Sequence, residues 1–172
     1  MKSSGICATY YSSPVGRILV SACNDGITGV WFDGQKHYAA GFNAENAVYV
    51  SRNDNEVIAM ACEWLDRYFS GSVPDFIPPL SLKGTEFRVK VWNALLKVEY
   101  GRTASYRDIA EMIADGKAEP STLCRAVGSA VGHNPVSLIV PCHRVIGADG
   151  SLAGYAGGME LKRRLLELEG TW

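Results

Sequence analysis

The spacing of apolar residues changes partway along this chain, and that change limits the folds available to it. Residues 8–32 alternate between apolar and polar around two turn signals, residues 12–16 and residues 24–26, which predicts an antiparallel β-meander. Between residues 56 and 69 the apolar side chains recur at helical spacing. We therefore expect an α/β protein of the α+β kind, with an N-terminal antiparallel sheet and helix followed by a mostly helical part.

A segment rich in glycine and proline separates the two parts. Residues 71–79 include Pro74, Pro78 and Pro79 and follow neither periodicity. The chain has 172 residues, which is enough for two small cores. We therefore expect two domains, residues 1–80 and residues 81–172.

Capping residues mark three helices in the second part. Thr85 precedes the first, and Ser105 with Asp108 resembles a capping box before the second. Ser121 or Thr122 is expected to cap the third. The second and third helices form a helix-turn-helix candidate. Many such pairs serve only packing, so DNA binding and simple packing both remain open from this pattern alone.

A cysteine and a histidine stand side by side after an apolar run. Residues 138–140 predict a short buried strand, which Pro141 closes because proline cannot donate to a sheet ladder. Cys142 follows, with His143 and Arg144 as the kind of neighbours that favour a thiolate. This arrangement fits a nucleophile, and at this point a buried structural cysteine fits equally well.

Composition narrows the classes of function. The five cysteines are scattered and the three histidines lie at no zinc-motif spacing from a cysteine pair, so we expect reduced thiols and no metal. No window approaches the ~18 apolar residues of a membrane span, and no signal sequence is evident, so we expect a cytoplasmic protein, or a nuclear one in a eukaryote. A net charge of −1 neither requires nor excludes nucleic acid.

Several separated segments together resemble one family, the O6-alkylguanine-DNA alkyltransferases, also called methylated-DNA–protein-cysteine methyltransferases. The resemblance is strong over residues 84–170 and loose over residues 1–80. The segments that carry it are Gly84-Thr85-Glu86-Phe87, Val91-Trp92, Tyr100-Gly101, Ser105-Tyr106, Arg125-Ala126-Val127-Gly128, Asn134-Pro135, Pro141-Cys142-His143-Arg144-Val145-Ile146-Gly147, Gly154-Tyr155-Ala156-Gly157-Gly158 and the tail from Lys162 to Gly170.

This resemblance implies DNA repair by direct reversal, with a ribonuclease H-like first domain. An alkyl group, methyl foremost, would pass irreversibly from O6 of guanine, or O4 of thymine, in double-stranded DNA to Cys142. The thioether is not hydrolysed, so a monomer would act once, as a suicide enzyme without a cofactor. Some relatives bind zinc in the first domain, but only Cys23 matches those ligands, and we expect none here.

The catalytic roles also come from the resemblance. His143 would act on Cys142 through a water molecule and Glu169 would orient His143, as in other activated nucleophiles. The thiol should then be ionised near neutral pH, although free cysteine has a pKa of ~8.5. Tyr106 would place its hydroxyl near N3 of the leaving guanine. Without the resemblance, Glu169 would be interpreted as a solvated charge and Tyr106 as a core residue.

A target atom inside a duplex has to be reached by flipping the nucleotide out. Arg125 matches the arginine that fills the vacated place in the family, although an exposed helix charge would look the same. The small residues Ala126, Gly128 and Ser129 would let this helix approach the minor groove closely. The loop of residues 115–120 looks longer than in many relatives, so the residue at which the helix begins is not fixed by the resemblance.

The substrate pocket is implied in the same way. Asn134 would couple the recognition helix to the active-site segment. The carbonyls of Cys142 and Val145 would accept from the exocyclic amine of guanine, the amide of Ala156 would face O6, and Tyr155 would form a wall. Two other functions remain alternatives: a lesion-binding module, whose known forms lack the reactive cysteine, and a transcriptional regulator, which would need a further domain.

Overall fold

The computed structural model describes residues 5–172. The chain forms two compact units, which divide between Lys83 and Gly84. Within the described residues, no helix is both long and apolar enough to cross a membrane.

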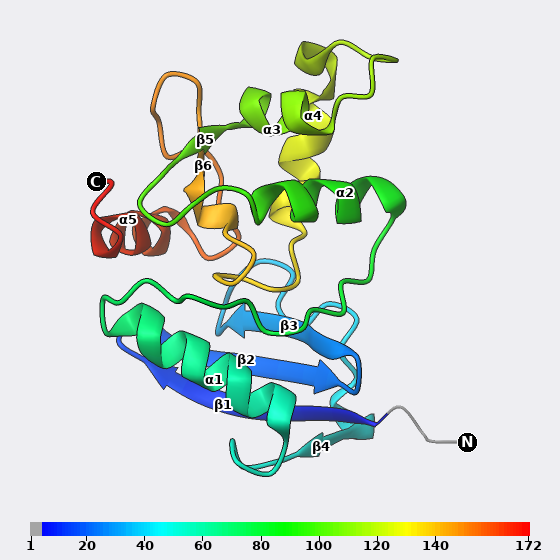
Figure 1. Cartoon of the computed structure of the whole chain (residues 1–172), viewed down its shortest axis with the longest axis vertical. Coiled ribbons are helices and arrows are strands. Elements are labelled where there is room, and N and C mark those ends of the chain that lie inside the picture. The colour runs from blue at the N-terminus through cyan, green and yellow to red at the C-terminus, as the bar shows by residue number, and fades with distance from the viewer. Residues whose placement is uncertain (1–4) are drawn as a thin grey trace. The chain divides into compact units, whose positions relative to one another are not determined.

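The first unit is a four-stranded sheet with one long helix (Figure 1). Three strands form the predicted antiparallel meander: β1 (Ile6–Ser13), β2 (Gly16–Cys23) and β3 (Gly26–Phe32). After a 3-10 turn, η1 (Ala44–Asn46), a fourth strand, β4 (Ala47–Tyr49), pairs in parallel with β1. The sequence analysis missed β4 because it is short and lies in a polar stretch without alternation.

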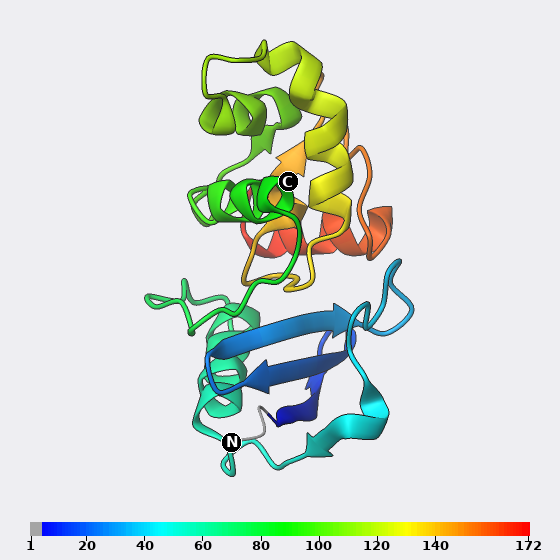
Figure 2. The ribbon, with the colours of Figure 1, turned by 90° about the vertical axis from the view of Figure 1, so that its right-hand side faces the viewer.

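Both faces of this sheet are covered (Figure 2). Helix α1 (Glu56–Phe69) begins at the cap Asn55 and buries Trp64 and Leu65 among its apolar residues, as the spacing predicted. On the opposite face Leu19 and Trp31 pack with the segment around Phe42. Successive side chains of a strand point to opposite faces of the sheet, so each strand contributes residues to two small cores.

The proline-rich segment between the units is bound to the sheet along part of its length. The amide of Ile27 donates to the carbonyl of Pro79 at 2.7 Å, and the amide of Ser81 donates to the carbonyl of Ile27 at 2.8 Å. Gly26 allows this approach, because a Cβ on it would lie 2.6 Å from the Pro79 backbone. The last residues of the segment therefore belong to the first unit.

The second unit is mostly helical. Its elements are α2 (Glu86–Leu95), β5 (Ala104–Ser105), α3 (Tyr106–Ile113), α4 (Pro120–Gly132), the 3-10 turn η2 (Cys142–Arg144), β6 (Val145–Ile146) and α5 (Met159–Leu168). Strands β5 and β6 form a parallel pair. Helices α3 and α4 pack together at the predicted helix-turn-helix, and Trp92 of α2 donates its indole N–H to the carbonyl of Ala130 at 2.8 Å.

The capping predictions for α2 and α3 are confirmed, but the one for α4 is wrong. Thr85 caps α2, and Ser105 with Asp108 forms a complete capping box. Helix α4 instead begins at Pro120 and has no side-chain cap, because proline is preorganised for the first helical position and lacks the N–H that a cap would satisfy.

The predicted strand at residues 138–140 is also wrong. This apolar run is buried in consecutive turns, with Leu138 at a φ of 70° and the amide of Val140 bonded to the carbonyl of Val136. A short buried turn and a short buried strand have the same apolar composition, so periodicity does not distinguish them.

Replacing Ser105 with Ala should lower the free energy of unfolding by about 1 kcal/mol, because the Asp108 amide loses its acceptor at the start of α3. Urea unfolding measures this loss. Ser121→Ala is the matched control: it changes an exposed serine in the first turn of α4, which lacks a side-chain cap, and should shift stability by less than about 0.5 kcal/mol. Equal losses in the two variants would contradict the capping assignment.

Candidate active site and DNA-binding helix

Cys142 begins the turn η2 and is buried, with 3% of its surface exposed. The buried side chain of Asn134, just after α4, fixes the turns before it. Its amide nitrogen donates to the carbonyl of Val140 at 2.8 Å, and its oxygen accepts from the amide of Val136 at 3.0 Å. The Asn134 side chain also lowers the pKa of the Cys142 thiol. One asparagine thus links the end of α4 to the cysteine.

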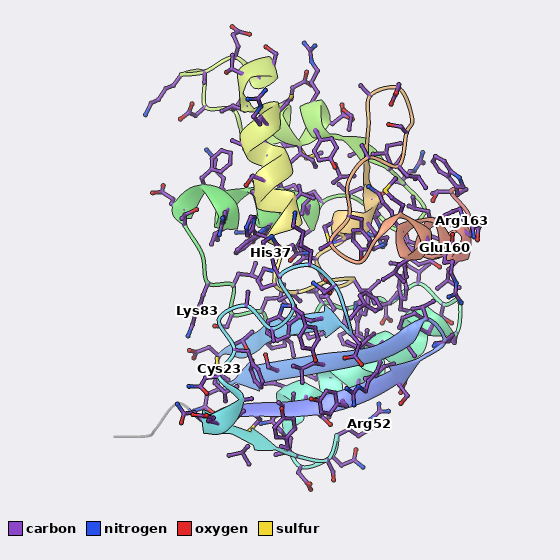
Figure 3. All side chains as sticks on the ribbon, turned by 180° about the vertical axis from the view of Figure 1, so that it is seen from behind. Cys23, His37, Arg52, Lys83, Glu160 and Arg163 are labelled. Atoms are coloured by element: carbon purple, nitrogen blue, oxygen red, sulfur yellow. The ribbon has the colours of Figure 1, made fainter. Side chains whose placement is uncertain are left out.

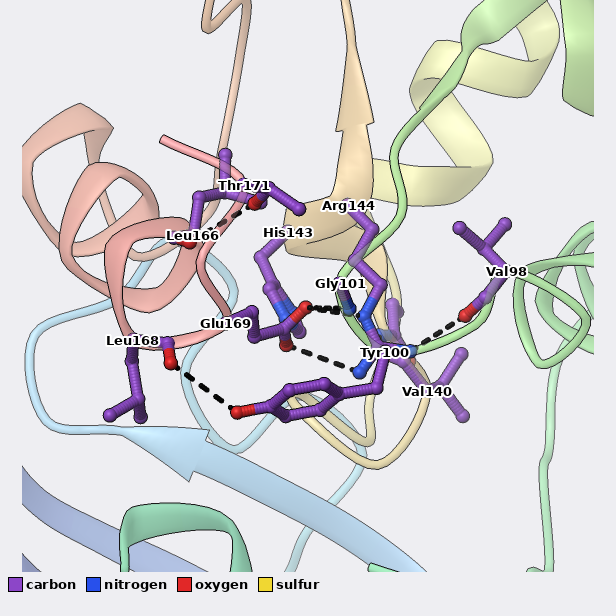
Figure 4. A network of polar contacts seen from close by, with 11 residues as sticks. Val98, Tyr100, Gly101, Val140, His143, Arg144, Leu166, Leu168, Glu169 and Thr171 are labelled. Carbon is purple, nitrogen blue, oxygen red and sulfur yellow. Dashed lines mark hydrogen bonds and ion pairs between the residues drawn. The ribbon is translucent and has the colours of Figure 1, made fainter. Parts of the chain in front are cut away.

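His143 and Arg144, the next two residues of η2, converge on one buried carboxylate (Figure 4). His143 Nε2 lies 2.6 Å from Glu169 Oε1. Arg144 Nε donates to Glu169 Oε2 at 2.9 Å, and its Nη1 donates to the carbonyl of Val98 at 2.6 Å. The amide of Gly101 donates to the same carboxylate at 3.4 Å. Glu169 is therefore not a solvated charge.

This network sets the protonation of His143. Burial lowers the pKa of His143, although Glu169 opposes that shift. Burial alone would raise the pKa of Glu169, but the hydrogen bonds and charges of His143 and Arg144 lower it to about 2. At neutral pH a neutral imidazole therefore faces a carboxylate. Because a carboxylate only accepts, the imidazole proton lies on Nε2, which leaves Nδ1 as an acceptor.

Burial also affects the Cys142 thiol. Burial raises the pKa of Cys142 above its ordinary value. The Asn134 side chain, the charge of Lys162 and nearby backbone N–H groups lower the pKa, but they do not outweigh burial. The folded site without substrate therefore favours the thiol over the thiolate, because a buried anion loses the hydration that stabilises it.

Tyr106 stands at the start of α3, between α4 and the segment before Tyr155. Its hydroxyl donates to the carbonyl of Ala153 at 2.7 Å. Its ring lies against Gly128, where a Cβ would be 3.7 Å from the ring. Burial and the neighbouring Cys142 raise the pKa of Tyr106, so its hydroxyl keeps its proton at neutral pH.

The remaining predicted pocket residues lie on β6 and on the segment that leads to α5. Val145 is buried, and its carbonyl accepts from the ammonium of Lys162. Tyr155 packs its ring on Gly157, and its buried hydroxyl has no hydrogen-bond partner among the described residues. Burial, with Cys142 and Glu169 nearby, raises the pKa of Tyr155 well above its ordinary value. Ala156 is half-buried.

The predicted DNA-binding residues occupy the outer side of α4. Arg125, Ala126 and Ser129 are exposed and Gly128 is half-buried, whereas Val127 and other apolar residues of α4 face the core. The helix therefore presents one arginine among small residues to solvent, as an element that approaches a duplex closely would.

No cluster of three or more residues within residues 5–172 has the composition of a metal site. Cys23, the one match to the zinc ligands of some relatives, is buried at the end of β2 (Figure 3).

Sequence reasoning gave no role to one buried residue of this site, Lys162. It lies on α5 and is fully buried. A signal for it was present, because Leu165 and Leu166 follow three and four residues later and place the lysine on the apolar side of the helix.

These features define a class of protein: a helix-turn-helix unit that also holds a buried cysteine next to a histidine fixed by a glutamate. Two family models match the chain. The 6-O-methylguanine DNA methyltransferase ribonuclease-like domain matches residues 6–82, and the DNA binding domain of the same family matches residues 86–171.

Similar proteins extend this match along nearly the whole chain. A methylated-DNA–protein-cysteine methyltransferase of Haemophilus influenzae is 40% identical, over 94% of this chain and 84% of its own length. One from Methanosarcina acetivorans is 41% identical, over 94% and 96%. The crystal structure of Mycobacterium tuberculosis OGT in complex with DNA has a TM-score of 0.80 at 37% identity, over 95% and 92%. The chain belongs to the 6-O-methylguanine DNA methyltransferase family.

Replacing Glu169 with Gln should lower the free energy of unfolding by about 3 kcal/mol near neutral pH, because the buried Arg144 guanidinium loses its anionic partner. The difference should shrink in acid. The pKa of Glu169 is about 2 in the folded protein and ~4.3 unfolded, so its ionised form stabilises the fold above about pH 4, and this contribution is lost as the pH falls toward 2.

Urea unfolding at neutral pH and at about pH 3 measures both effects. Glu160→Gln is the control, since Glu160 lies exposed on α5 beside Arg163 (Figure 3), and a surface ion pair of this kind contributes little to stability. A loss for Glu169→Gln no larger than for the control would contradict the role given to the buried carboxylate.

Proposed function

We propose that this protein repairs DNA by moving an alkyl group, methyl foremost, from O6 of guanine in double-stranded DNA to Sγ of Cys142. One observation carries the proposal. A buried cysteine lies beside Asn134 and is followed by a neutral histidine, His143, whose Nε2 is hydrogen-bonded to Glu169 Oε1 at 2.6 Å. The relatives named as methylated-DNA–protein-cysteine methyltransferases support it.

In the reaction, His143 takes the thiol proton as a general base, through a water molecule, and Sγ attacks the alkyl carbon. An S–C bond forms, the C–O6 bond breaks, and its electron pair leaves with guanine. A neutral imidazole suits this task, since it can accept a proton while Glu169 stabilises the resulting cation. The raised pKa of Cys142 means that the thiolate forms during the reaction.

Charge that develops on the leaving guanine needs donors. We assign Tyr106 to N3 and the amide of Ala156 to O6, with the carbonyls of Cys142 and Val145 accepting from the exocyclic amine and Tyr155 as the wall. O4-alkylthymine carries its alkyl group on an equivalent ring oxygen, so we include it as a second substrate. The thioether is stable in water, so transfer is irreversible, and one monomer repairs one lesion.

The exposed side of α4 supports a role in nucleotide flipping. Arg125 would enter the base stack where the target nucleotide has left it, and Ala126, Gly128 and Ser129 would lie along the minor groove. Asn134 would couple the position of α4 to that of Cys142, because its side chain is hydrogen-bonded to the segment before the cysteine. We assign DNA binding and alkyl transfer to residues 81–172 and a supporting role to residues 1–80. The protein would act where the chromosomal DNA lies, in the cytoplasm or in a nucleus.

Incubation with a duplex carrying O6-methylguanine should add one methyl group per molecule, on the peptide that contains Cys142. Intact-protein and peptide mass spectrometry measure the product. Cys142→Ala should abolish the addition while binding of the lesion persists, and Cys124→Ala, which changes the thiol on α4, should still accept the methyl group. An unchanged mass of the wild-type protein would refute the proposal.

Arg125→Ala should slow methyl transfer from duplex DNA by about tenfold or more, because an unfilled gap in the base stack makes flipping costlier by at least about 1.4 kcal/mol. Transfer from the free base O6-methylguanine should change little. Arg163→Ala is the control for lost charge, since this arginine pairs with Glu160 on the exposed side of α5. Single-turnover kinetics with both substrates separates the steps, and equal slowing of both would argue against the assignment.

A further inference from the structure

Lys162 is a buried cation that makes no ion pair with a carboxylate within residues 5–172. Its ammonium donates to three backbone carbonyls: that of Val145 on β6, and those of Ala153 and Gly154 at 3.2 Å each. An ammonium has three N–H donors, so each donor has one acceptor. These bonds tie the segment before Tyr155 to β6.

Such a residue is costly to bury. Moving an ammonium out of water is unfavourable unless its hydrogen bonds are replaced, and an apolar side chain of similar volume would fill the same space without that cost. Burial lowers the pKa of Lys162 to about 8, although the neighbouring Cys142 opposes the shift. Packing alone therefore does not explain a lysine at this position.

The carbonyl of Ala153 connects Lys162 to Tyr106. It accepts both from Lys162 Nζ at 3.2 Å and from the Tyr106 hydroxyl at 2.7 Å. A tyrosine hydroxyl has a single proton to donate. If Tyr106 gives that proton to a guanine, it has to leave the Ala153 carbonyl, and a flipped base would at the same time exclude water from that carbonyl. Lys162 is the donor that remains.

We propose that Lys162 is a positioning residue that keeps the Ala153 carbonyl paired, so that the Tyr106 hydroxyl can turn to N3 of the flipped guanine. This inference rests on the proposed function, because it needs Tyr106 to meet a base. It differs from a general effect of the ammonium charge on Cys142, which would change transfer from every substrate by the same factor.

A pair of substrates tests the proposal: duplexes with O6-methylguanine and with O6-methyl-3-deazaguanine, which has a C–H in place of N3. In the wild-type protein the ratio of the two single-turnover rates should exceed the ratio measured in Tyr106→Phe by about tenfold, the effect of one hydrogen bond to a developing charge. In Lys162→Met the ratio should fall to the Tyr106→Phe value, whatever happens to the absolute rates.

The control is Lys90→Met, which removes an exposed lysine of α2 and should leave the ratio unchanged. A wild-type ratio retained in Lys162→Met would overturn the inference, as would a wild-type ratio equal to that of Tyr106→Phe. A wild-type protein that transfers no methyl group at all would instead contradict the proposed function, so the two failures are distinct.

A second measurement needs no variant and decides the matter if Lys162→Met does not fold. A neutral amine has two N–H donors for three carbonyls, so the wild-type ratio should decline as the pH rises through the pKa of Lys162, about 8. Among the described residues, Cys142 and His143 are titratable groups close enough to Lys162 for their charges to interact with it, and Tyr106 shares the Ala153 carbonyl with it. Ionisation of Cys142 and His143 affects both substrates alike and cancels in the ratio, and the raised pKa of Tyr106 keeps its proton. A flat ratio between about pH 7 and about pH 9 would overturn the inference.

Discussion

The site depends on the hydrogen bonds and ion pairs of the buried Glu169 carboxylate. A buried charge is tolerated only when it is paired and its hydrogen bonds are satisfied, and Glu169 meets that requirement with groups from separate segments. His143 and Arg144 approach it from η2, and the amide of Gly101 approaches it from the connection between α2 and β5. A different conformation of the turn that begins with Cys142 would leave the carboxylate unpaired. The carboxylate therefore holds this turn in one arrangement.

Burial shifts the pKa values of Cys142 and His143 in opposite directions, and both shifts favour the neutral form. It raises the pKa of the Cys142 thiol and lowers that of the His143 imidazole. A neutral thiol beside a neutral base can exchange a proton when a substrate arrives, whereas a standing thiolate would react with any electrophile that reached it. Under the proposed function, this resting state protects an acceptor that acts only once.

Helix α5 supplies the ionisable groups behind the cysteine. Lys162 lies on its buried side, and Glu169 follows directly after its last residue, so the two positions are 169 − 162 = 7 residues apart, or about two helical turns. The lysine holds the backbone of Val145 and Ala153, and the glutamate holds the His143 imidazole. A rotation of this helix would disturb both, which couples the geometry of His143 to that of the residues around Tyr106.

Much of the local structure could be predicted, because turn and cap signals act over a few residues. The two hairpin turns, the cap Thr85 and the capping box at Ser105 all formed where the residues indicated. The failures share a cause. Strand β4 is stabilised by pairing with a distant strand, and the apolar run at residues 138–140 is buried in turns that its composition cannot distinguish from a strand.

The sequence by itself determined which reactive residues stand together, since Cys142, His143 and Arg144 are adjacent in the chain. It also indicated that an arginine among small residues would lie on a helix. Only the tertiary structure decided how those groups are protonated and which residues fix their positions. Glu169 lies 26 residues beyond His143, and Lys162 on α5 donates to the carbonyl of Ala153 in the preceding loop. A pKa depends on burial and on charges brought close in space, and neither can be obtained from neighbours in sequence.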